Sequence, residues 1–405
     1  MVTNKEQNKL NVPHLRFPEF HGEWEKCKLG DIAILTKGSG ISKDQRSATG
    51  TPCILYGELY TTYKSEVIDY VVSKTDISDK NLVRSCANDI IIPSSGETAI
   101  DISTARCVLS PDVLLGGDLN IIRLKDGDGR FFSYQLNGVR KYNIAKIAQG
   151  VSVVHLYGES IKGLTVSFPS NKEQQKISTL LSLIDERIAT QSKLIEKLES
   201  LIKGIMVELQ KQGVNKGTWK KVFLSDVLTE RNERNTNLFQ VFSVSVSQGV
   251  VNQVDYLGRS FAAKDTSKYN VVHYGDLVYT KSPTGSFPYG IVKQSLSLEN
   301  VAVSPLYGVY KPKSLAVGAY LHEYFMSEIN THNYLHPLIQ KGAKNTINIT
   351  NQRFLENCVL LPTNINELLQ ISKLLRSLNN KIKYQQDILQ QYQKQKQYLL
   401  RQMFI

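Results

Sequence analysis

Few residues of this sequence have the types and spacing that a metal site or a cofactor site requires. His332 and His336 have the i, i+4 spacing at which one face of a helix could hold a metal ion. Pro337 follows at once, so the end of a surface helix is the favoured interpretation of this pair. Gly38 and Gly40 form a Gly-x-Gly among basic neighbours but lack a third glycine, which favours a turn or a loop that approaches phosphate over a cofactor cradle.

The motifs of enzymes that act on nucleic acids are missing from the sequence. No Gly-x-x-x-x-Gly-Lys-Ser/Thr loop is present, so there is no sign of a nucleotide-driven motor. No two of the 12 prolines are adjacent, which excludes the Asn-Pro-Pro-Tyr type of motif of amino-methyltransferases. Asp112 has no Asp/Glu-x-Lys sequence at a usable distance downstream, as a metal-dependent nuclease would require. We therefore predict binding without chemistry, with no catalytic residue, no metal site and no cofactor bound by this chain.

Polar and basic loops supply binding chemistry instead. Arg231 and Arg234 carry fork-shaped donors that could read guanine edges in a major groove, and the amides of Asn232 and Asn235 could read adenine. Each such loop could also be an ordinary solvated face, or could simply hold phosphates. The candidate DNA contacts lie in or beside these loops: Lys37, Lys43, Arg46, Tyr56, Tyr60, Ser94, Ser95, Ser152, Arg231, Asn232, Arg234, Asn235, Lys281, Ser282, Lys341, Lys344 and Asn345.

A long heptad pattern must position these loops. Apolar residues alternate at steps of three and four, interrupted only by Gln191, in the series Ile177, Leu181, Ile184, Ile188, Ile195, Leu198, Ile202, Ile205 and Leu209. A 3.5-residue repeat keeps one stripe of a helix facing a partner, so this series predicts the seam of a coiled coil. Pro169 and the capping-box spacing of Ser170 and Glu173 predict where the helix begins, and Gly213 predicts where it ends.

The same seam recurs 194 residues later, with Gln385 in the place of Gln191. Its members are Ile371, Leu375, Leu378, Ile382, Gln385, Leu389, Tyr392, Lys396, Leu399 and Met403. Asn364 and Glu367 could form the same type of cap. A short stripe would favour packing against a globular core, but about five heptads at a constant offset favour two long helices paired with each other. Lys396 departs from the apolar repeat, which predicts a polar or subunit-facing position.

The segment before each helix is also duplicated. A Trp followed by Leu five residues on and Asp seven on occurs at Trp24 and again at Trp219, which predicts the same opening helix twice. Short β-like runs split by Gly, Pro and Ser follow, with a helical stretch at 131–148. Asp89 and Asp276 occupy parallel positions, whereas the stretches between such positions do not resemble each other. We therefore predict two mixed α/β domains that read different targets on one framework.

Length and composition agree with this organisation. We predict an N-terminal arm at 1–20, a first domain at 21–168, a spacer helix at 169–212, a linker at 213–218, a second domain at 219–362 and a C-terminal helix at 363–405. The net charge of +12 favours a polyanionic partner such as nucleic acid. The five cysteines form no CxxC pair and predict reduced thiols. Without a signal core or an apolar run of ~20 residues, we expect a soluble cytoplasmic protein.

The duplicated order of these features resembles the specificity subunit of type I restriction–modification systems. The resemblance covers the chain from Arg16-Phe-Pro18 onward and includes the ending from Tyr398 to Phe404. It implies an α/β fold with two target-recognition domains, each followed by a long helix, and an antiparallel coiled coil that makes the repeat pseudo-two-fold. It also implies that each domain reads one half of a bipartite DNA target.

The resemblance further implies partners and cofactors. Modification (methyltransferase) subunits, expected as two, would carry S-adenosylmethionine chemistry on adenine, and restriction subunits would bring ATP and Mg for translocation and cleavage. The chain itself would be the non-catalytic subunit of this DNA-methylating phage-defence complex. Two other classes stay open: a stand-alone two-headed DNA-binding regulator, and a coiled-coil scaffold whose globular ends bind proteins. Binding that does not depend on salt would favour the scaffold.

Overall fold

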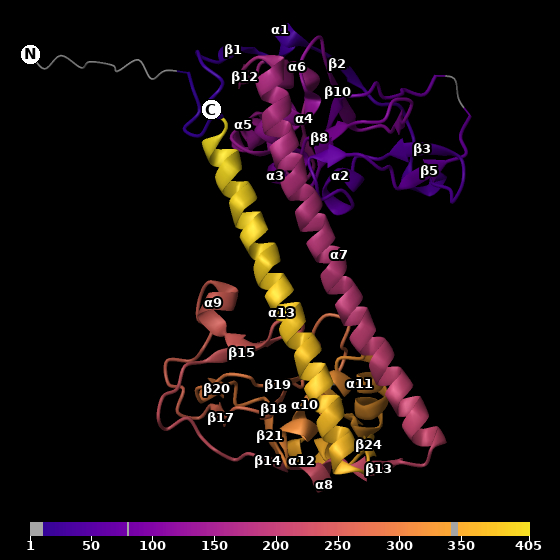
Figure 1. Ribbon diagram of the computed structural model, residues 1–405, viewed down its shortest axis with the longest axis vertical. Helices are drawn as coiled ribbons and strands as arrows, with labels where there is room; N and C mark the ends of the chain where they lie inside the picture. The colour runs from indigo at the N-terminus through magenta and orange to yellow at the C-terminus, as the bar shows by residue number, and fades with distance from the viewer. Residues whose placement is uncertain (1–10, 79–80, 342–346) are drawn as a thin grey trace, which may run out of the picture. The chain divides into compact units, whose positions relative to one another are not determined.

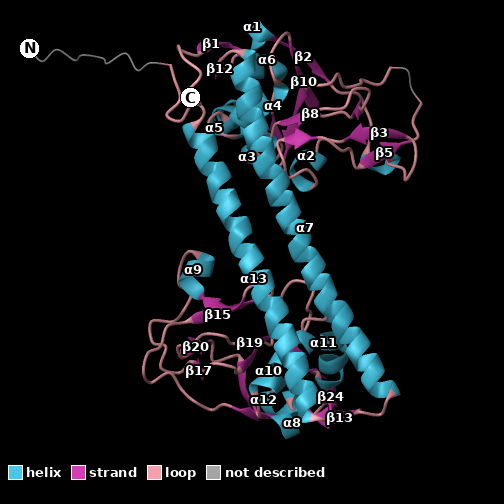
Figure 2. Ribbon diagram, in the orientation of Figure 1, coloured by secondary structure: helices cyan, strands magenta, loops and turns pink. Residues whose placement is uncertain are grey.

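The structure is a computed structural model that describes residues 11–78, 81–341 and 347–405 (Figure 1). The chain divides into two compact units. The first comprises the residues up to Ser192 together with Asp387–Ile405, and the second is Lys193–Gln386. Each unit holds one α/β domain and a part of each of two long helices (Figure 2). The structure thus contains the two mixed domains and the two long helices that the sequence predicts.

The domain of the first unit is built on a five-stranded sheet. Its strands in spatial order are β2 (Ala33–Lys37), β10 (Leu119–Leu124), β6 (Asp89–Pro93), β8 (Arg106–Val108) and β4 (Val67–Ile68). β6 is central and buried along its whole length, as its run of three isoleucines predicts. A smaller sheet contains β5 (Ser73–Thr75), β3 (Thr51–Ile54) and β9 (Leu114–Leu115).

Short helices and aromatic side chains complete this first domain. The helices are η1 (Lys43–Gln45), α2 (Glu58–Thr61), α3 (Ala99–Ile102), α4 (Gly129–Asn137), α5 (Lys141–Ile147) and α6 (Gly158–Lys162). Phe131 of α4 packs edge-on against Trp24 at 5.6 Å and lies 5.0 Å from Phe404, between ring centres. All three rings are buried. The last residues of the chain therefore belong to the core of the first domain.

Each domain opens with a strand, not with the helix that we predicted. β1 (Glu25–Lys28) pairs antiparallel with β12 (Thr165–Phe168), and one turn of helix, α1 (Leu29–Ile32), follows β1. In the second domain β13 (Trp219–Phe223) pairs in the same way with β24 (Cys358–Pro362), before α8 (Leu224–Val227). The partner strands lie more than a hundred residues away, which a local pattern does not reveal. Each domain is thus closed where its first and last strands meet.

The domain of the second unit repeats the plan with a four-stranded sheet. Its order is β14 (Leu228–Glu230), β21 (Gly308–Pro312), β18 (Leu277–Tyr279) and β19 (Val292–Gln294). Three two-stranded ladders are β15 (Phe242–Ser245) with β16 (Gly249–Asn252), β17 (Asn270–Val272) with β20 (Val301–Val303), and β22 (Gln340–Lys341) with β23 (Ile347–Asn348). The remaining helices are α9 (Gln253–Leu257), α10 (Leu315–Tyr324), α11 (Glu328–Leu335), η2 (His336–Leu338) and α12 (Asn351–Phe354).

The two long helices are α7 (Asn171–Asn215), of 45 residues, and α13 (Ile365–Gln402), of 38 residues. α7 continues through Gly213, where we predicted its end. A Cβ at Gly213 would lie 2.1 Å from Cδ1 of Trp219, so the glycine permits a close approach and does not end the helix. Within the described ranges, no helix combines the length and apolarity that a membrane span needs.

The carboxylates of the predicted capping boxes serve other partners. Glu173 is buried and receives two hydrogen bonds from the guanidinium of Arg16, at 2.7 and 2.8 Å. Glu367 accepts a hydrogen bond from the indole Nε1–H of Trp219 at 2.7 Å. Asn364 does cap α13, because its Oδ1 accepts from the backbone N–H of Asn366 at 2.8 Å. The two glutamates therefore tie each long helix to its own domain instead of capping it.

The predicted seam faces inward on both long helices. Buried members are Ile177, Leu181, Ile184, Ile195, Leu198, Ile202, Ile371, Leu375, Ile382, Lys396, Leu399 and Met403. Half-buried members are Ile188, Gln191, Ile205, Leu378, Gln385 and Leu389. In the first unit, Ile177 and Leu181 share one apolar cluster with Leu399, Met403 and Phe131. This part of the seam contacts the domain core as well as α13, so the alternative that the sequence disfavoured holds here. The C-terminal end of α13 meets the N-terminal part of α7, which makes these two segments antiparallel.

Lys396 lies inside the first unit, not on the subunit-facing surface that we considered. Its Nζ forms ion pairs with Asp185, at 2.6 Å, and with Glu66, and none of the three side chains is more than 10% exposed. Asp185 also accepts hydrogen bonds from Tyr134 at 2.8 Å and Ser65 at 2.9 Å. Burial lowers the pKa of Lys396, but the two carboxylates raise it by more, and the net direction is upward.

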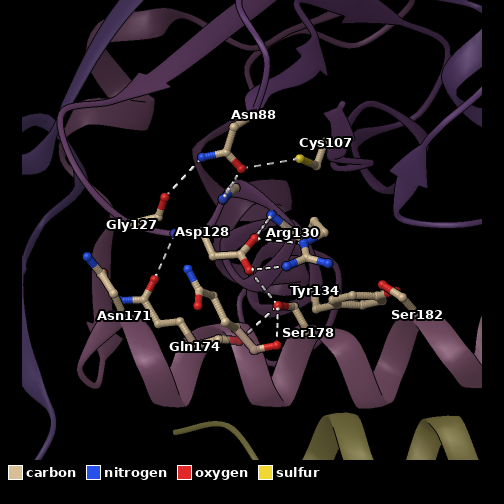
Figure 3. Close-up of polar contacts among 12 residues, drawn as sticks. Asn88, Cys107, Gly127, Asp128, Arg130, Tyr134, Asn171, Gln174, Ser178 and Ser182 are labelled. Carbon is tan, nitrogen blue, oxygen red and sulfur yellow. Dashed lines mark hydrogen bonds and ion pairs between the residues drawn. The ribbon is translucent and has the colours of Figure 1, made fainter. Parts of the chain in front are cut away.

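A second polar network ties the first two turns of α7 to α4 (Figure 3). The carboxylate of Asp128 caps α4 by accepting from the backbone N–H of Arg130 at 2.9 Å, and it also accepts from Ser178 Oγ at 2.7 Å. The backbone N–H of Asp128 donates to Gln174 Oε1 at 3.0 Å. Asp128, Gln174 and Ser178 are all buried, and paired polar groups of this kind fix one relative placement of two helices.

Candidate nucleic-acid interface

Candidate residues of the first unit meet at one edge of its sheet. Lys37 ends β2 opposite Asn120 of β10, and Pro93 ends β6 opposite Leu119 of β10. Because these neighbouring strands are antiparallel, the ends of β2 and β6 and the start of β10 lie at the same edge. Lys37 is exposed there, and Ser94 follows directly after β6. We call this the first strand-end edge.

The two other serine candidates lie next to this edge. Ser95 begins β7 (Ser95–Gly96), which pairs antiparallel with β11 (Val154–His155), and Ser152 is exposed in the turn just before β11. Ser94 is buried and its backbone N–H donates to the carbonyl of Asp118 at 2.7 Å. Ser95 and Ser152 are therefore placed to meet a ligand, whereas Ser94 shapes the turn.

Tyr60 and Tyr56 are half-buried near the same segment. Burial raises the pKa of the Tyr60 phenol, and the charges of Tyr56, Asp101 and Glu97 raise it further, which places these groups close together. Glu97 is exposed two residues after Ser95. Glu97 is not among the residues that we predicted, although a carboxylate can accept from the N4 amino group of cytosine. Its position two residues after a strand-end serine pair was the available signal.

Lys43 and Arg46 are exposed but belong to a different part of the first domain. Both lie in or next to η1, which is attached to the small sheet because Thr75 Oγ1 donates to the carbonyl of Gln45 at 2.7 Å. Arg46 Nη1 also lies 3.7 Å from Oε1 of the buried Glu58, so the Arg46 guanidinium is paired with a carboxylate of its own domain. These two residues are therefore not brought to the first strand-end edge.

The second unit has a corresponding edge with different side chains. Glu230 ends β14 opposite Tyr310 of β21, and Tyr279 ends β18 opposite Gly308 at the start of β21. The ends of β14 and β18 and the start of β21 therefore lie at one edge, which we call the second strand-end edge. Lys281 follows β18 by two residues, as Ser95 follows β6.

Lys281 has an unusual backbone and environment. Its φ of 60° lies in the left-handed region, which costs a non-glycine residue about 1–2 kcal/mol. Its side chain is half-buried, and this burial lowers the pKa of its ammonium group, against the attraction of Glu230. In the described part of the chain this ammonium forms no hydrogen bond or ion pair. Strain of this type gathers at functional positions, which strengthens the case for Lys281. Ser282, next to it, is exposed.

The two arginines predicted to read bases make internal contacts. Arg231 donates to both carboxylate oxygens of Asp276, at 2.5 and 3.0 Å. In the first unit the equivalent Asp89 is held at 2.8 and 2.7 Å by Arg123, which comes from a different strand. The repeated aspartate therefore needs an arginine, and Arg231 supplies it, so its fork is not available to guanine in this conformation. Arg234 is exposed, but one of its nitrogens donates to Asn270 Oδ1 at 2.5 Å.

The neighbouring asparagines differ in exposure. Asn232 is exposed and stays a candidate. Asn235 is fully buried, and its amide both donates to the carbonyl of Phe239 and accepts from the N–H of Phe239. Asn235 thus holds a turn and cannot read adenine, which corrects our prediction. An asparagine that closes a turn and one that reads a base look alike in the sequence.

Of the three candidates near the end of the second domain, the structure describes only Lys341. Lys344 and Asn345 lie outside the described residues. Lys341 ends β22, opposite Ile347 of β23. The rings of His332 and His336 are stacked 5.1 Å apart beside Tyr289, and no group of three or more potential metal ligands occurs among the residues that the structure describes.

Comparison with known proteins places this arrangement. Residues 21–200 match the family model described as the type I restriction modification DNA specificity domain. This match covers less than half of the chain. The resemblance that we drew from the duplicated motifs is thereby confirmed for the specificity-domain segment. The matched range contains the first strand-end edge and the part of α7 up to residue 200, but no part of α13.

Relatives of the specificity-domain family cover more of the chain. The specificity subunit of the type I restriction enzyme MjaVIII from Methanocaldococcus jannaschii is 26% identical over 217 residues, which are 52% of this chain and 46% of that protein. A second specificity subunit of this archaeon is 26% identical over 220 residues and is covered over 50% of its length. The chain thus spans about half the length of the curated relatives that it matches.

A solved relative covers nearly the whole fold. The crystal structure of the S subunit of a type I restriction–modification system from M. genitalium has a TM-score of 0.64 and 15% identity, and the match covers 97% of this chain and 99% of that one. At this identity the likeness concerns the fold alone. The predicted fold class, two mixed α/β domains with two long helices, is confirmed.

Proposed function

We propose that this chain is the DNA specificity subunit of a type I restriction–modification complex, in which each domain reads one half of a bipartite target. The observation that carries the proposal is the repeated strand-end edge. Both domains place loops at the same edge of equivalent sheets, while the side chains on those loops differ. In protein–DNA interfaces, exposed polar and basic side chains on such loops supply both phosphate contacts and base contacts.

The two edges carry different side chains, as the reading of two different half-sites would require. The first presents Lys37, Ser95, Ser152 and the acidic Glu97, and the second presents Lys281, Ser282 and Asn232. Lysine side chains contact DNA phosphates and so position the protein on the duplex, whereas serine, asparagine and glutamate can discriminate base edges. The net charge of the whole chain, +12, supports attraction to a polyanion.

The chemistry of the complex is assigned to partner subunits in this proposal. Two modification subunits would bring S-adenosylmethionine and transfer methyl groups to adenine, and restriction subunits would bring ATP and Mg. The two long helices would dock the modification subunits while the domains read the DNA. This chain itself would need only to bind DNA and its partners, which accords with the missing motor, methyltransferase and nuclease motifs.

Selection from a randomised duplex library tests the proposal with the purified full chain. We expect enrichment of two short blocks separated by unread base pairs, with an affinity that falls steeply as salt rises because phosphate contacts release counterions. Failure to enrich any sequence, or affinity that ignores salt, would overturn the proposal and favour a protein-binding scaffold.

A second measurement separates a restriction–modification subunit from a stand-alone regulator. Deletion of the gene from its host should remove N6-methyladenine at the selected motif across the genome. A genome whose methylation does not change, in a strain where the chain still selects the motif, would favour the regulator.

A further inference from the structure

The second domain exposes an aromatic ring with a cation stacked on it. The guanidinium carbon of Arg259 lies 4.5 Å from the ring centre of Phe261, in the loop after α9. Phe261 is 59% exposed and Arg259 is exposed as well. A cation over an aromatic face is a modest interaction at an exposed site, about 0.5–1 kcal/mol, so it does not explain why a phenylalanine is held in water. We call this pair the Arg–Phe platform.

The loop that carries the platform is held in place by side chains. Gln253 Oε1 accepts from the backbone N–H of Phe261 at 2.8 Å and from Ser260 Oγ at 3.4 Å. The phenolic oxygen of Tyr269 accepts from the backbone N–H of Ala263 at 3.0 Å. These bonds fix the loop on both sides of Phe261. The ring is therefore presented to solvent by a built structure, which is a common property of recognition loops.

A hollow of about 470 Å³ is lined by Ser260 and Ala262, the residues on either side of Phe261 in the chain. Its polar lining includes Gln240, Asn252, Asp255, Ser260 and Thr266, and Asn252 Nδ2 donates to Gln240 Oε1 at 3.0 Å. Amide and carboxylate groups are the side chains that pair with adenine and cytosine edges. The hollow thus offers hydrogen-bonding groups next to a stacking surface.

The chain around the platform is basic. Lys264 and Lys268 are exposed on the same loop, and Arg234 lies against it, because its Nη1 donates to the carbonyl of Lys268 at 3.1 Å. The one carboxylate within this stretch of loop, Asp265, accepts from the backbone N–H of Ser267 at 2.9 Å. Positive side chains interleaved with an exposed aromatic ring are typical of surfaces that bind nucleic-acid backbone and bases.

We propose that the Arg–Phe platform is a second DNA-contact element of the second domain, separate from the strand-end edge. Arg259 binds a phosphate, and Phe261 packs against the sugar and base beside it. The inference rests on the proposed function and extends the footprint of the second half-site. The first domain has its small sheet with η1 at the corresponding point of the chain, so different elements would contact DNA in the two half-sites.

Two substitutions in the full chain test the proposal through different signatures. Arg259→Ala should lower the slope of log affinity against log salt by about one, the share of one phosphate contact. Phe261→Ala should weaken binding of the selected duplex about tenfold, or ~1.4 kcal/mol, without a change in that slope, because it removes an apolar contact and no charge. Arg259→Lys, which keeps the charge, should keep the slope.

The control is Lys220→Ala, which removes another exposed charge from β13 of the same unit and should change neither quantity. The platform proposal is overturned if the wild-type chain selects a bipartite motif while Arg259→Ala and Phe261→Ala bind that motif as the wild type does. If the wild-type chain selects no motif, the proposed function fails first, and the platform proposal falls with it. The two failures are therefore distinguishable in one experiment.

Discussion

Lys281 joins a strained backbone to a half-buried charge at the second strand-end edge. Its positive φ is unfavourable for lysine, and its burial works against its charged form. Both features lower stability, and neither is compensated by an internal ion pair among the described residues. A DNA phosphate at this edge would stabilise the charge. Lys281 therefore lowers the stability of the fold while it strengthens DNA binding, and substitution can separate the two effects.

Substitution of Lys281 separates these two effects. Lys281→Gly should raise the free energy of unfolding of the second unit by about 1 kcal/mol, because glycine adopts this φ without strain. Lys281→Ala should give no such gain. Both variants should weaken DNA binding equally, measured by titration of the selected duplex. If Lys281→Ala bound DNA with the wild-type affinity, Lys281 would be an ordinary turn residue.

Lys396 shows how much one buried charge can matter to stability. Lys396→Met would leave Glu66 and Asp185 buried without their cation, and breaking such a group costs about 3–5 kcal/mol. We expect a clear fall in the denaturant midpoint of the first unit, followed by Trp24 fluorescence in a Trp219→Phe background, because Trp219 of the second unit also emits. The matched control, Lys394→Met on the exposed face of α13, should leave that midpoint within ~0.5 kcal/mol of the wild type.

The same residue sets a pH dependence whose sign follows from its pKa. The pKa of Lys396 is raised in the folded state, so the folded state holds this proton more tightly than the unfolded state does. Its contribution is fully present below the ordinary lysine pKa of ~10.4 and is lost as pH rises through the higher folded pKa. The difference in stability between wild type and Lys396→Met should shrink above pH ~10.4. A difference that grew with pH would contradict this assignment.

Residue roles were the least predictable part of the site. Arg231 and Asn235 have the types that read bases, yet one holds Asp276 and the other closes a turn. Lys396 lies at a seam position, but its partner Glu66 is 330 residues away in the chain. Each of these outcomes depends on which residue of a distant segment lies nearby. Local sequence shows the type of a side chain but not which residue of a distant segment it contacts.

At the scale of elements, the periodicity of the sequence predicts the two repeated long helices but not the pairing of strands that lie far apart in the chain. The two heptad series gave α7 and α13 almost to their ends, because a stripe at a constant spacing is a local property. The opening segments at Trp24 and Trp219 were predicted as helices, and they lead into strands whose partners are the last strands of their domains. The seam also packs on the first domain's core, which its periodicity alone did not distinguish from a helix pair.

Two glycines of α7 make a matched test of helix packing. Gly204→Ala should stabilise the protein by up to ~1 kcal/mol, because its Cβ would meet open space and alanine favours helix. Gly213→Ala should destabilise the second unit by about 1–3 kcal/mol, because its Cβ would collide with the Trp219 ring. Denaturant unfolding of the two variants measures both effects. A stabilised Gly213→Ala variant would mean that the helix ends before this residue.

At the scale of the whole molecule, α7 and α13 are shared by both units, since each helix continues from one unit into the other. A continuous helix rises ~1.5 Å per residue, so its length could set the distance between two half-sites. The matching positions of Gln191 and Gln385 provide equivalent points at which both helices can be altered together.

Lengthening both helices tests this role as a ruler. One heptad inserted after Gln191 and another after Gln385 keep both seams in register and add ~10 Å, about three base pairs. Duplex selection should then return the same two blocks with a longer unread spacer. Insertions of three residues, which break the heptad register, should abolish selection. Unchanged spacing with the heptad insertions would mean that the helices do not set the distance.

Exchange of one domain tests the central claim most directly, that each domain reads its own half of a bipartite target. Residues 219–361 should be replaced by the corresponding segment of another specificity subunit, between the strands that close the domain, and the motif should be determined by duplex selection with the full chimaeric chain. The account predicts that one block changes to that of the donor while the other block stays the same. A chimaera that folds and selects two altered blocks, or two unaltered ones, would contradict it.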